Sequence, residues 1–177
     1  MSSQEARTAS QMAMALAVEA HGDTRRFSGE LYINHPRRVA EMLAAAGHDD
    51  DTVAAGWLHD TVEDTWVTLD LLRTLGFSAD VINAVESVTH RPGEWYFDSI
   101  RRAAAHSIGC VVKLADNQDN SAWEPSSSER FRKRQQQIRK YAKARTLLWE
   151  AVLGCDSATR LPYAQPRSWF SRPAVAA

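Results

Sequence analysis

Apolar residues recur at three- and four-residue steps through most of this 177-residue chain, and this spacing constrains its fold more than any other feature. The spacing is that of one face of an amphipathic helix. Only 8 glycines and 6 prolines are present, which argues against a loop-rich sheet protein. The segment 107–120 begins with β-branched residues that could form a buried strand, but no other strand offers it a partner. The sequence therefore predicts an all-α fold, a single helical bundle.

Glycines, prolines and capping residues divide the chain into expected helices. We expect them over about 5–21, 36–46, 51–63, 68–75, 78–90, 96–105, 107–120 and 131–152. The third would begin at a cap formed by Asp51 or Thr52, and the segment 21–34 would be a loop with extended pieces near residues 31–33. We place one domain at 1–160, followed by an irregular tail at 161–177 that contains three prolines and no periodicity.

Charge and composition exclude several classes of protein. A net charge of -1 does not suit a protein that binds a nucleic-acid polymer through bulk charge. No apolar run is long enough to span a membrane, and residues 1–10 do not resemble an export signal. Cys110 and Cys155 lack the spacing of a disulfide framework or a thiolate zinc site. We therefore expect a cytoplasmic protein with no membrane or nucleic-acid partner, and we make no prediction of its oligomeric state.

Two His-Asp dyads occur, and their surroundings differ. His48-Asp49 follows a helix-ending glycine in GHDDDT, where acidic residues cap the next helix. His59-Asp60 instead follows the apolar run AAGWL inside an expected buried helix, where ionisable groups are costly unless they are paired or bind a metal. One turn further along that helix, Glu63 and Asp64 would share a cleft with the dyad. Without the rest of the chain, an acidic helix end explains this cluster equally well.

Two other segments supply candidate ligands. Asp116 ends the apolar run before it and shares a helix face with Lys113 and Asn120, and His35 precedes the proline that opens a helix. Taken alone, Asp116 and His35 are each better explained as structural residues than as metal ligands. With the dyad, they form a set of two imidazoles and two carboxylates that suits Mn²⁺ or another divalent metal. Such an ion can polarise a phosphoryl oxygen and activate water, which favours a metal-dependent phosphohydrolase in which Glu63 and Asp64 manage protons.

Over roughly residues 10–150 the chain resembles the HD-domain hydrolases of the RelA/SpoT type, especially the small stand-alone alarmone hydrolases. The resemblance is carried by RFSGELYINHP (26–36), AAGWLHDTVEDT (54–65), VTLDLL, VESVTH and VKLADNQDN (112–120). It implies an HD-domain fold and the removal of pyrophosphate from the 3′ position of (p)ppGpp. By this resemblance the Mn²⁺ ligands are His35, His59, Asp60 and Asp116. Glu63 and Asp64 would assist hydrolysis.

The chain departs from the family at two cationic positions. Phe27 replaces the lysine of the usual Arg-Lys-Ser, and Asn117 replaces the Arg or Lys that follows KLAD. The expected substrate-binding residues are therefore Arg26, Ser28, Lys113 and Asn120. The lost cations favour an alternative, a phosphatase that acts on another nucleotide such as a nucleoside monophosphate. A further alternative is a nucleotide-binding or antitoxin-like module without turnover. We expect no synthetase domain of the kind that the long bifunctional relatives carry beside their hydrolase domain.

Overall fold

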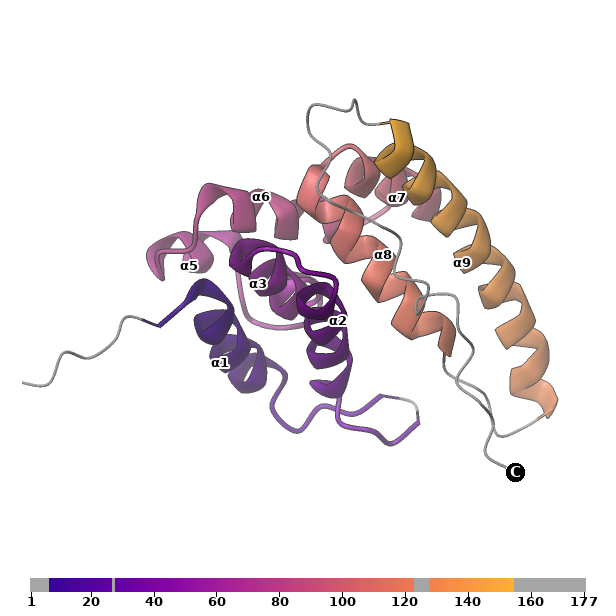
Figure 1. The fold of residues 1–177 in the computed structure, drawn as a ribbon. Helices are drawn as coiled ribbons and strands as arrows, with labels where there is room; N and C mark the ends of the chain where they lie inside the picture. The colour runs from indigo at the N-terminus through magenta and orange to yellow at the C-terminus, as the bar shows by residue number, and fades with distance from the viewer. Residues whose placement is uncertain (1–6, 27, 123–127, 155–177) are drawn as a thin grey trace, which may run out of the picture.

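The computed structural model describes residues 7–26, 28–122 and 128–154, and its regular elements within these ranges are all helices (Figure 1). The helices are α1 (Ala9–His21), α2 (Asn34–Ala45), α3 (Asp50–Leu58), α4 (Thr61–Asp64), α5 (Leu69–Thr74), α6 (Ala79–Val88), α7 (Tyr96–Ala104), α8 (Ser107–Ala122) and α9 (Ser128–Gly154). Within the described residues, β-type pairing is limited to one isolated antiparallel bridge, between Arg25 and Leu31. The predicted all-α fold is confirmed, and the ambiguous segment 107–120 is helical. The predicted tail at 161–177 lies outside the described residues.

Several helices are capped at their N-termini by short polar side chains. These side chains accept hydrogen bonds from backbone N–H groups that have no partner within the helix. Thr68 and Ser78 cap α5 and α6 in this way, as the sequence predicts. The predicted cap of α3 was wrong by two or three residues. The Asp49 carboxylate accepts from the Thr52 N–H at 2.9 Å, and Asp50 and Asp51 lie in the first turn, near the positive end of the helix dipole.

The predicted helix over 51–63 was wrong in one respect, because it is broken at His59 and Asp60. Side chains on either side of the break bond to backbone carbonyls: His59 Nδ1 to Gly56 O, and Thr61 Oγ1 to Leu58 O, both at 2.8 Å. These carbonyls would otherwise accept from N–H groups four residues later in a continuous helix. The dyad therefore lies at the junction between α3 and α4.

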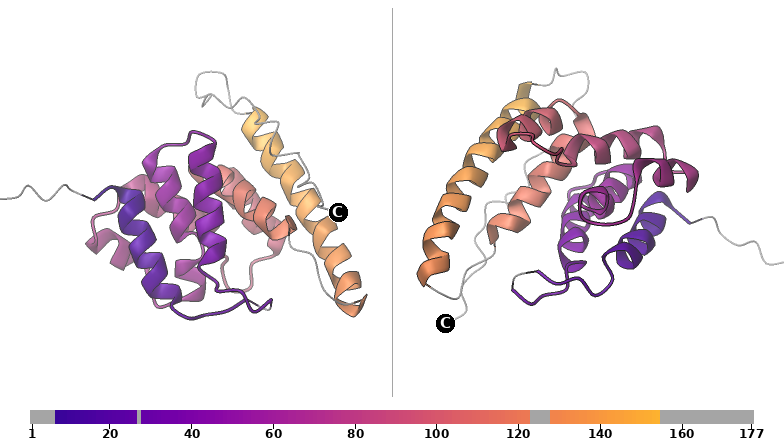
Figure 2. Two further views of the ribbon diagram at one scale, coloured as in Figure 1. Left: turned by 60° about the horizontal axis from the view of Figure 1, so that its bottom comes forward. Right: turned by 180° about the vertical axis from the view of Figure 1, so that it is seen from behind.

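Helix α3 lies at the centre of the main core, where it contacts α1, α2, α6 and α8. Its packing against α2 is close, because a Cβ on Gly56 would lie 2.6 Å from Leu43 Cδ1 and 3.3 Å from Ala40 Cα. Helix α9 runs along one edge of the molecule and packs on α7 and α8 (Figure 2). A second, smaller core fills that interface; its buried members are Ile100, Cys110, Leu114, Ala144 and Leu148.

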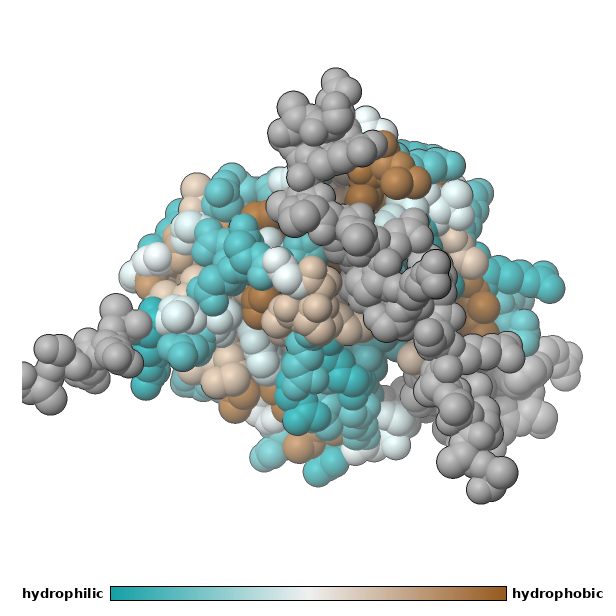
Figure 3. Space-filling view, in the orientation of Figure 1, coloured by the Kyte–Doolittle hydropathy of each residue, from teal (hydrophilic) through white to brown (hydrophobic). Residues whose placement is uncertain are grey.

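The surface in Figure 3 is mostly hydrophilic, with hydrophobic residues in separate patches. Scattered exposed apolar side chains of this kind are ordinary for a folded domain. Within the described ranges, no helix combines the length and the apolar content needed to cross a membrane.

Candidate metal centre and adjoining pocket

Three separate parts of the chain bring four side chains to one point beside the main core. His35 comes from the first turn of α2, His59 and Asp60 from the break between α3 and α4, and Asp116 from α8. His35 Nε2 lies 3.3 Å from His59 Nε2, 3.3 Å from Asp116 Oδ1 and 3.5 Å from Asp60 Oδ2. His59 Nε2 lies 3.2 Å from Asp60 Oδ2 and 4.0 Å from Asp116 Oδ1. The structure thus brings together the four residues that the sequence predicts as metal ligands.

The second nitrogen of each imidazole is already engaged. His59 Nδ1 must carry a proton, because its partner Gly56 O can only accept. His35 Nδ1 lies 2.7 Å from Asp119 Oδ2, and that carboxylate also accepts from the Arg38 guanidinium. When both rings are neutral, the lone pair of each Nε2 is therefore directed into the space between the four side chains. An imidazole held by a carboxylate or carbonyl in this way is typical of a metal ligand.

The charges around the four side chains fit a cation. The two Nε2 atoms lie 3.2 to 4.0 Å from carboxylate oxygens of Asp60 and Asp116, close to the separation of atoms that share one ion at about 2.0–2.2 Å. The ligand atoms of His35, His59 and Asp60 form the tightest group, all within 4.8 Å of one another. Burial alone would lower the pKa of His35, but Asp116, Asp119 and Asp60 outweigh it and raise that pKa to about 9. Without an ion, a proton on His35 thus takes the place of the missing positive charge. The donor set is one that a divalent metal can occupy.

Tyr32 and Asp64 lie beside the ligands. The Tyr32 hydroxyl is 2.7 Å from Asp60 Oδ2 and 2.8 Å from Asp64 Oδ2, so its one proton is shared between two carboxylates. Burial and these two charges raise the pKa of Tyr32, which keeps the phenol protonated. Glu63 points elsewhere, because its Oε2 accepts from the His90 backbone N–H at 2.8 Å. Of the two predicted catalytic carboxylates, Asp64 is thus linked to the ligand Asp60 through the Tyr32 hydroxyl, whereas the Glu63 side chain bonds to His90.

Three of the four residues predicted to bind substrate are linked to the ligand Asp116, whereas Ser28 bonds to a neighbouring residue. Arg26 Nη2 donates to Asn120 Oδ1 at 2.6 Å, and Asn120 donates to Asp116. Lys113 Nζ lies 2.8 Å from Asp116 Oδ2. Burial alone would raise the pKa of Asp116, but Lys113 and the two ligand histidines hold it well below its ordinary value. Ser28 is exposed, and its hydroxyl accepts from the Glu30 N–H at 3.4 Å. Phe27 lies outside the described residues.

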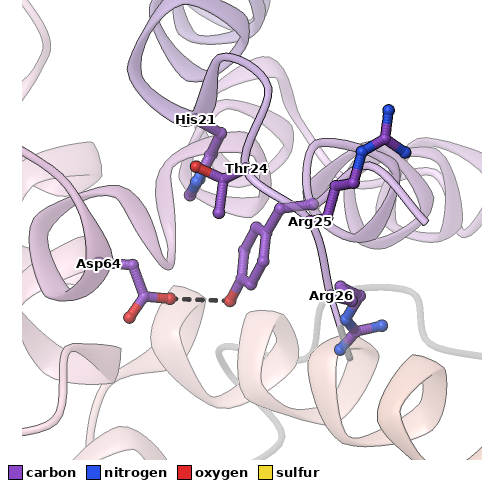
Figure 4. A pocket seen from close by; sticks show the side chains of 6 residues that line it. His21, Thr24, Arg25, Arg26 and Asp64 are labelled. Carbon is purple, nitrogen blue, oxygen red and sulfur yellow. Dashed lines mark hydrogen bonds between the residues drawn. The ribbon is translucent and has the colours of Figure 1, made fainter. Parts of the chain in front are cut away.

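A pocket of about 410 Å³ adjoins the ligands on the side of Tyr32 and Asp64 (Figure 4). Its wall is formed by His21, Thr24, Arg25, Arg26, Tyr32 and Asp64. The His21 ring stacks on Tyr32, with ring centres 4.8 Å apart. The pocket combines two guanidinium groups with a carboxylate and places them next to the candidate metal centre.

Sequence reasoning missed three residues of this arrangement: His21, Tyr32 and Asp119. Asp119 could have been found, since it follows Asp116 by three residues and shares its helix face. His21 and Tyr32 meet only because the loop 22–33 folds back, and no spacing indicates that contact.

Comparison with known proteins gives a consistent picture. The model of an HD domain family matches residues 13–144. The chain is 39% identical over 119 residues to a probable guanosine-3′,5′-bis(diphosphate) 3′-pyrophosphohydrolase of Synechocystis, and 40% identical over 109 residues to the 3′-pyrophosphohydrolase MESH1 of Xenopus tropicalis. These matches cover 61% and 56% of this chain, but 16% and 60% of the relatives. The chain thus spans only part of the length of each.

One solved structure, of a metazoan ortholog of SpoT described as hydrolysing ppGpp, superposes with a TM-score of 0.60. The superposition covers 86% of this chain and 98% of that one, at 22% identity. At that identity the likeness shows a shared fold.

Proposed function

Because this chain belongs to the HD domain family, we propose that it is a metal-dependent phosphohydrolase that removes pyrophosphate from the 3′ position of (p)ppGpp. The observation that carries the proposal is the meeting of four ligand atoms, with both imidazoles held by their other nitrogens. In a purely structural cluster, burying two imidazole nitrogens beside two carboxylates costs free energy, and a bound cation would offset that cost. The names of the Synechocystis and Xenopus relatives supply the substrate.

His35, His59, Asp60 and Asp116 would hold the metal, for which Mn²⁺ is our candidate because the donors are nitrogen and oxygen without thiolate. When bound, such an ion supplies Lewis-acid chemistry that activates water for attack on phosphorus. Asp119 would keep His35 in the tautomer that binds metal, and Gly56 O would do the same for His59.

Asp64 is the residue we assign to proton transfer. Its carboxylate lies in the pocket wall and shares the Tyr32 proton with the ligand Asp60, so it can accept a proton from the attacking water. Attack of the water oxygen on the phosphorus bonded to the 3′ oxygen of ppGpp breaks that P–O bond, the proton accepted by Asp64 passes to the leaving 3′ oxygen, and pyrophosphate and GDP are released. The sequence assigns Glu63 to the same task, which would require its side chain to leave the His90 N–H.

Cations near the ligands would hold the phosphates. Arg25 and Arg26 line the pocket, and Lys113 lies on the α8 side of the ligands. Lys140 of α9 can supply the positive charge that Asn117 does not carry. Its Nζ lies 4.0 Å from the centre of the Tyr96 ring. Asn117 is buried beside that ring. The region around Asn117 therefore keeps a positive charge suited to a phosphorylated substrate.

The alternative substrate, another nucleotide such as a nucleoside monophosphate, is favoured by one observation. At position 117 itself the chain offers a neutral amide whose Oδ1 has no hydrogen-bond partner among the described residues. A substrate with fewer phosphates needs fewer cations.

Product analysis tests the proposal. Purified protein with Mn²⁺ would be offered ppGpp beside nucleoside mono-, di- and triphosphates, together with the His59→Ala variant. His48→Ala is the matched control, because His48 belongs to the other His-Asp dyad, in the turn before α3. Pyrophosphate and GDP from ppGpp, lost in His59→Ala and kept in His48→Ala, are the expected result. Inorganic phosphate from another nucleotide would favour the alternative, and binding without turnover would favour a non-catalytic module.

A further inference from the structure

His21 is a buried histidine whose chemistry the proposed mechanism does not use. Only 3% of the residue is exposed, and its Nε2 has no hydrogen-bond partner among the described residues. Buried polar atoms nearly always have a partner, because leaving one unpaired costs free energy. Because His21 lines the pocket, a molecule bound there would be the partner of its Nε2.

The position of His21 is well defined. It is the last residue of α1, and its ring stacks on Tyr32 at an interplanar angle of 25°. In Figure 4 the His21 side chain extends toward the side of the pocket where Asp64 lies, and the guanidinium group of Arg25 points away from it. Burial lowers the pKa of His21 against the charges of Asp60 and Asp64, so the ring is neutral at pH 7. Its Nε2 can therefore make a hydrogen bond without adding charge.

The neighbours of His21 restrict what it can bind. A phosphate group would be drawn to Arg25 and Arg26 and repelled by the Asp64 carboxylate. A hydroxyl group suits the space near Asp64, because it can donate to the carboxylate and still bond to an imidazole nitrogen. In a nucleotide whose 3′ phosphorus lies at the ligands beside Asp64, the sugar hydroxyl closest to that phosphorus is the one on C2′.

From this geometry we propose that His21 recognises the ribose 2′-hydroxyl of the substrate, so that the pocket selects ribonucleotides over deoxyribonucleotides. The inference rests on the proposed function for the placement of the 3′ phosphorus. It makes His21 a specificity-determining residue. A bound water could satisfy the same nitrogen without any such role, and the experiment below separates the two.

The test compares ppGpp with its 2′-deoxy analogue on the wild type, His21→Phe and His21→Gln. Phenylalanine keeps the stack on Tyr32 and removes the nitrogen, whereas glutamine keeps an amide that can bond to a hydroxyl. We expect kcat/KM of the wild type to fall about tenfold with the deoxy analogue, as for one lost hydrogen bond to a substrate. His21→Phe should lose about tenfold on ppGpp and show no further loss with the analogue, and His21→Gln should recover part of the discrimination.

Two controls make the result specific. His48→Phe replaces a half-buried histidine outside the pocket and should discriminate as the wild type does. The melting temperature of His21→Phe should be equal to or above that of the wild type, because an apolar ring relieves an unpaired buried nitrogen. His21→Phe that still discriminates against the deoxy analogue as the wild type does would overturn the inference and leave the proposed function intact.

Calorimetry covers the case in which ppGpp is not hydrolysed. Failure of turnover by the wild type would count against the proposed function alone. Titration with GDP and 2′-deoxy-GDP would then measure the selectivity directly, with the ribonucleotide expected to bind about tenfold more tightly to the wild type and equally to His21→Phe. Equal binding of both nucleotides to the wild type, or no binding of either, would overturn the inference about His21.

Discussion

Replacing Asp119 with asparagine should weaken metal binding although Asp119 is not one of the four ligands. Its carboxylate accepts from His35 Nδ1 at 2.7 Å and from the Arg38 guanidinium through two nitrogens. An asparagine has one accepting oxygen in place of two and no charge, so if that oxygen faces His35, its NH₂ group faces the Arg38 Nε–H, a donor against a donor. The contact that keeps the His35 Nε2 lone pair directed at the metal would then be weaker and less well positioned.

Partners of this kind typically contribute 10- to 100-fold to metal affinity. We therefore expect the Kd for Mn²⁺ to rise by about 10- to 100-fold in Asp119→Asn, which corresponds to about 1.4–2.7 kcal/mol. His35 and Asp119 are both almost fully buried, so screening by solvent should not reduce the effect much.

Isothermal titration of the metal-free protein with Mn²⁺ measures this directly. The matched control is Asp98→Asn, which also removes a carboxylate paired with an arginine, Arg101 at 2.6 Å, but on the exposed face of α7. An exposed pair of this kind contributes little, so the control should bind Mn²⁺ like the wild type. A Kd for Asp119→Asn within about threefold of the wild-type value would refute a role for Asp119 in orienting the ligand, since that is well below the range typical of such partners.

Four other predictions concern His35, the packing of α3 and the role of Asp64. Mn²⁺ affinity should rise with pH between 6.5 and 9, because the pKa of His35 is raised to about 9 in the metal-free protein and the metal must displace that proton; titrations at three pH values check this. The raised pKa of His35 also stabilises the metal-free protein. This contribution is fully present below pH 6.5 and should be lost as the pH rises from 6.5 to 9, which urea unfolding at several pH values would measure. Gly56→Ala should destabilise the protein by about 1–3 kcal/mol, because the new Cβ would crowd Leu43 and Ala40; an unchanged melting temperature would contradict this close packing. Asp64→Asn should lower kcat by about 10²- to 10⁴-fold with Mn²⁺ affinity kept, and a parallel loss of metal binding would instead make Asp64 a ligand.

The broken helix at His59 and Asp60 shows where periodicity stops being informative. The apolar pattern continues smoothly through AAGWLHDTVEDT, so an uninterrupted helix was the natural prediction. The break depends on hydrogen bonds from His59 and Thr61 to carbonyls within three residues. Such local competition between side chain and backbone leaves the hydrophobic pattern unchanged. In the short helix that follows, Glu63 bonds to the His90 N–H and Asp64 to the Tyr32 hydroxyl.

The sequence by itself determined the all-α class, most helix boundaries and the four residues that meet at the candidate metal centre. These depend on local properties, namely apolar spacing, capping side chains and the cost of burying ionisable groups. Only the tertiary structure decided how those four residues are supported and what surrounds them. Asp119 bonds to His35 across 84 positions of the chain, and His21 meets Tyr32 because a loop folds back onto α1. Contacts between segments far apart in sequence arise from the packing of whole helices, and no local pattern encodes them.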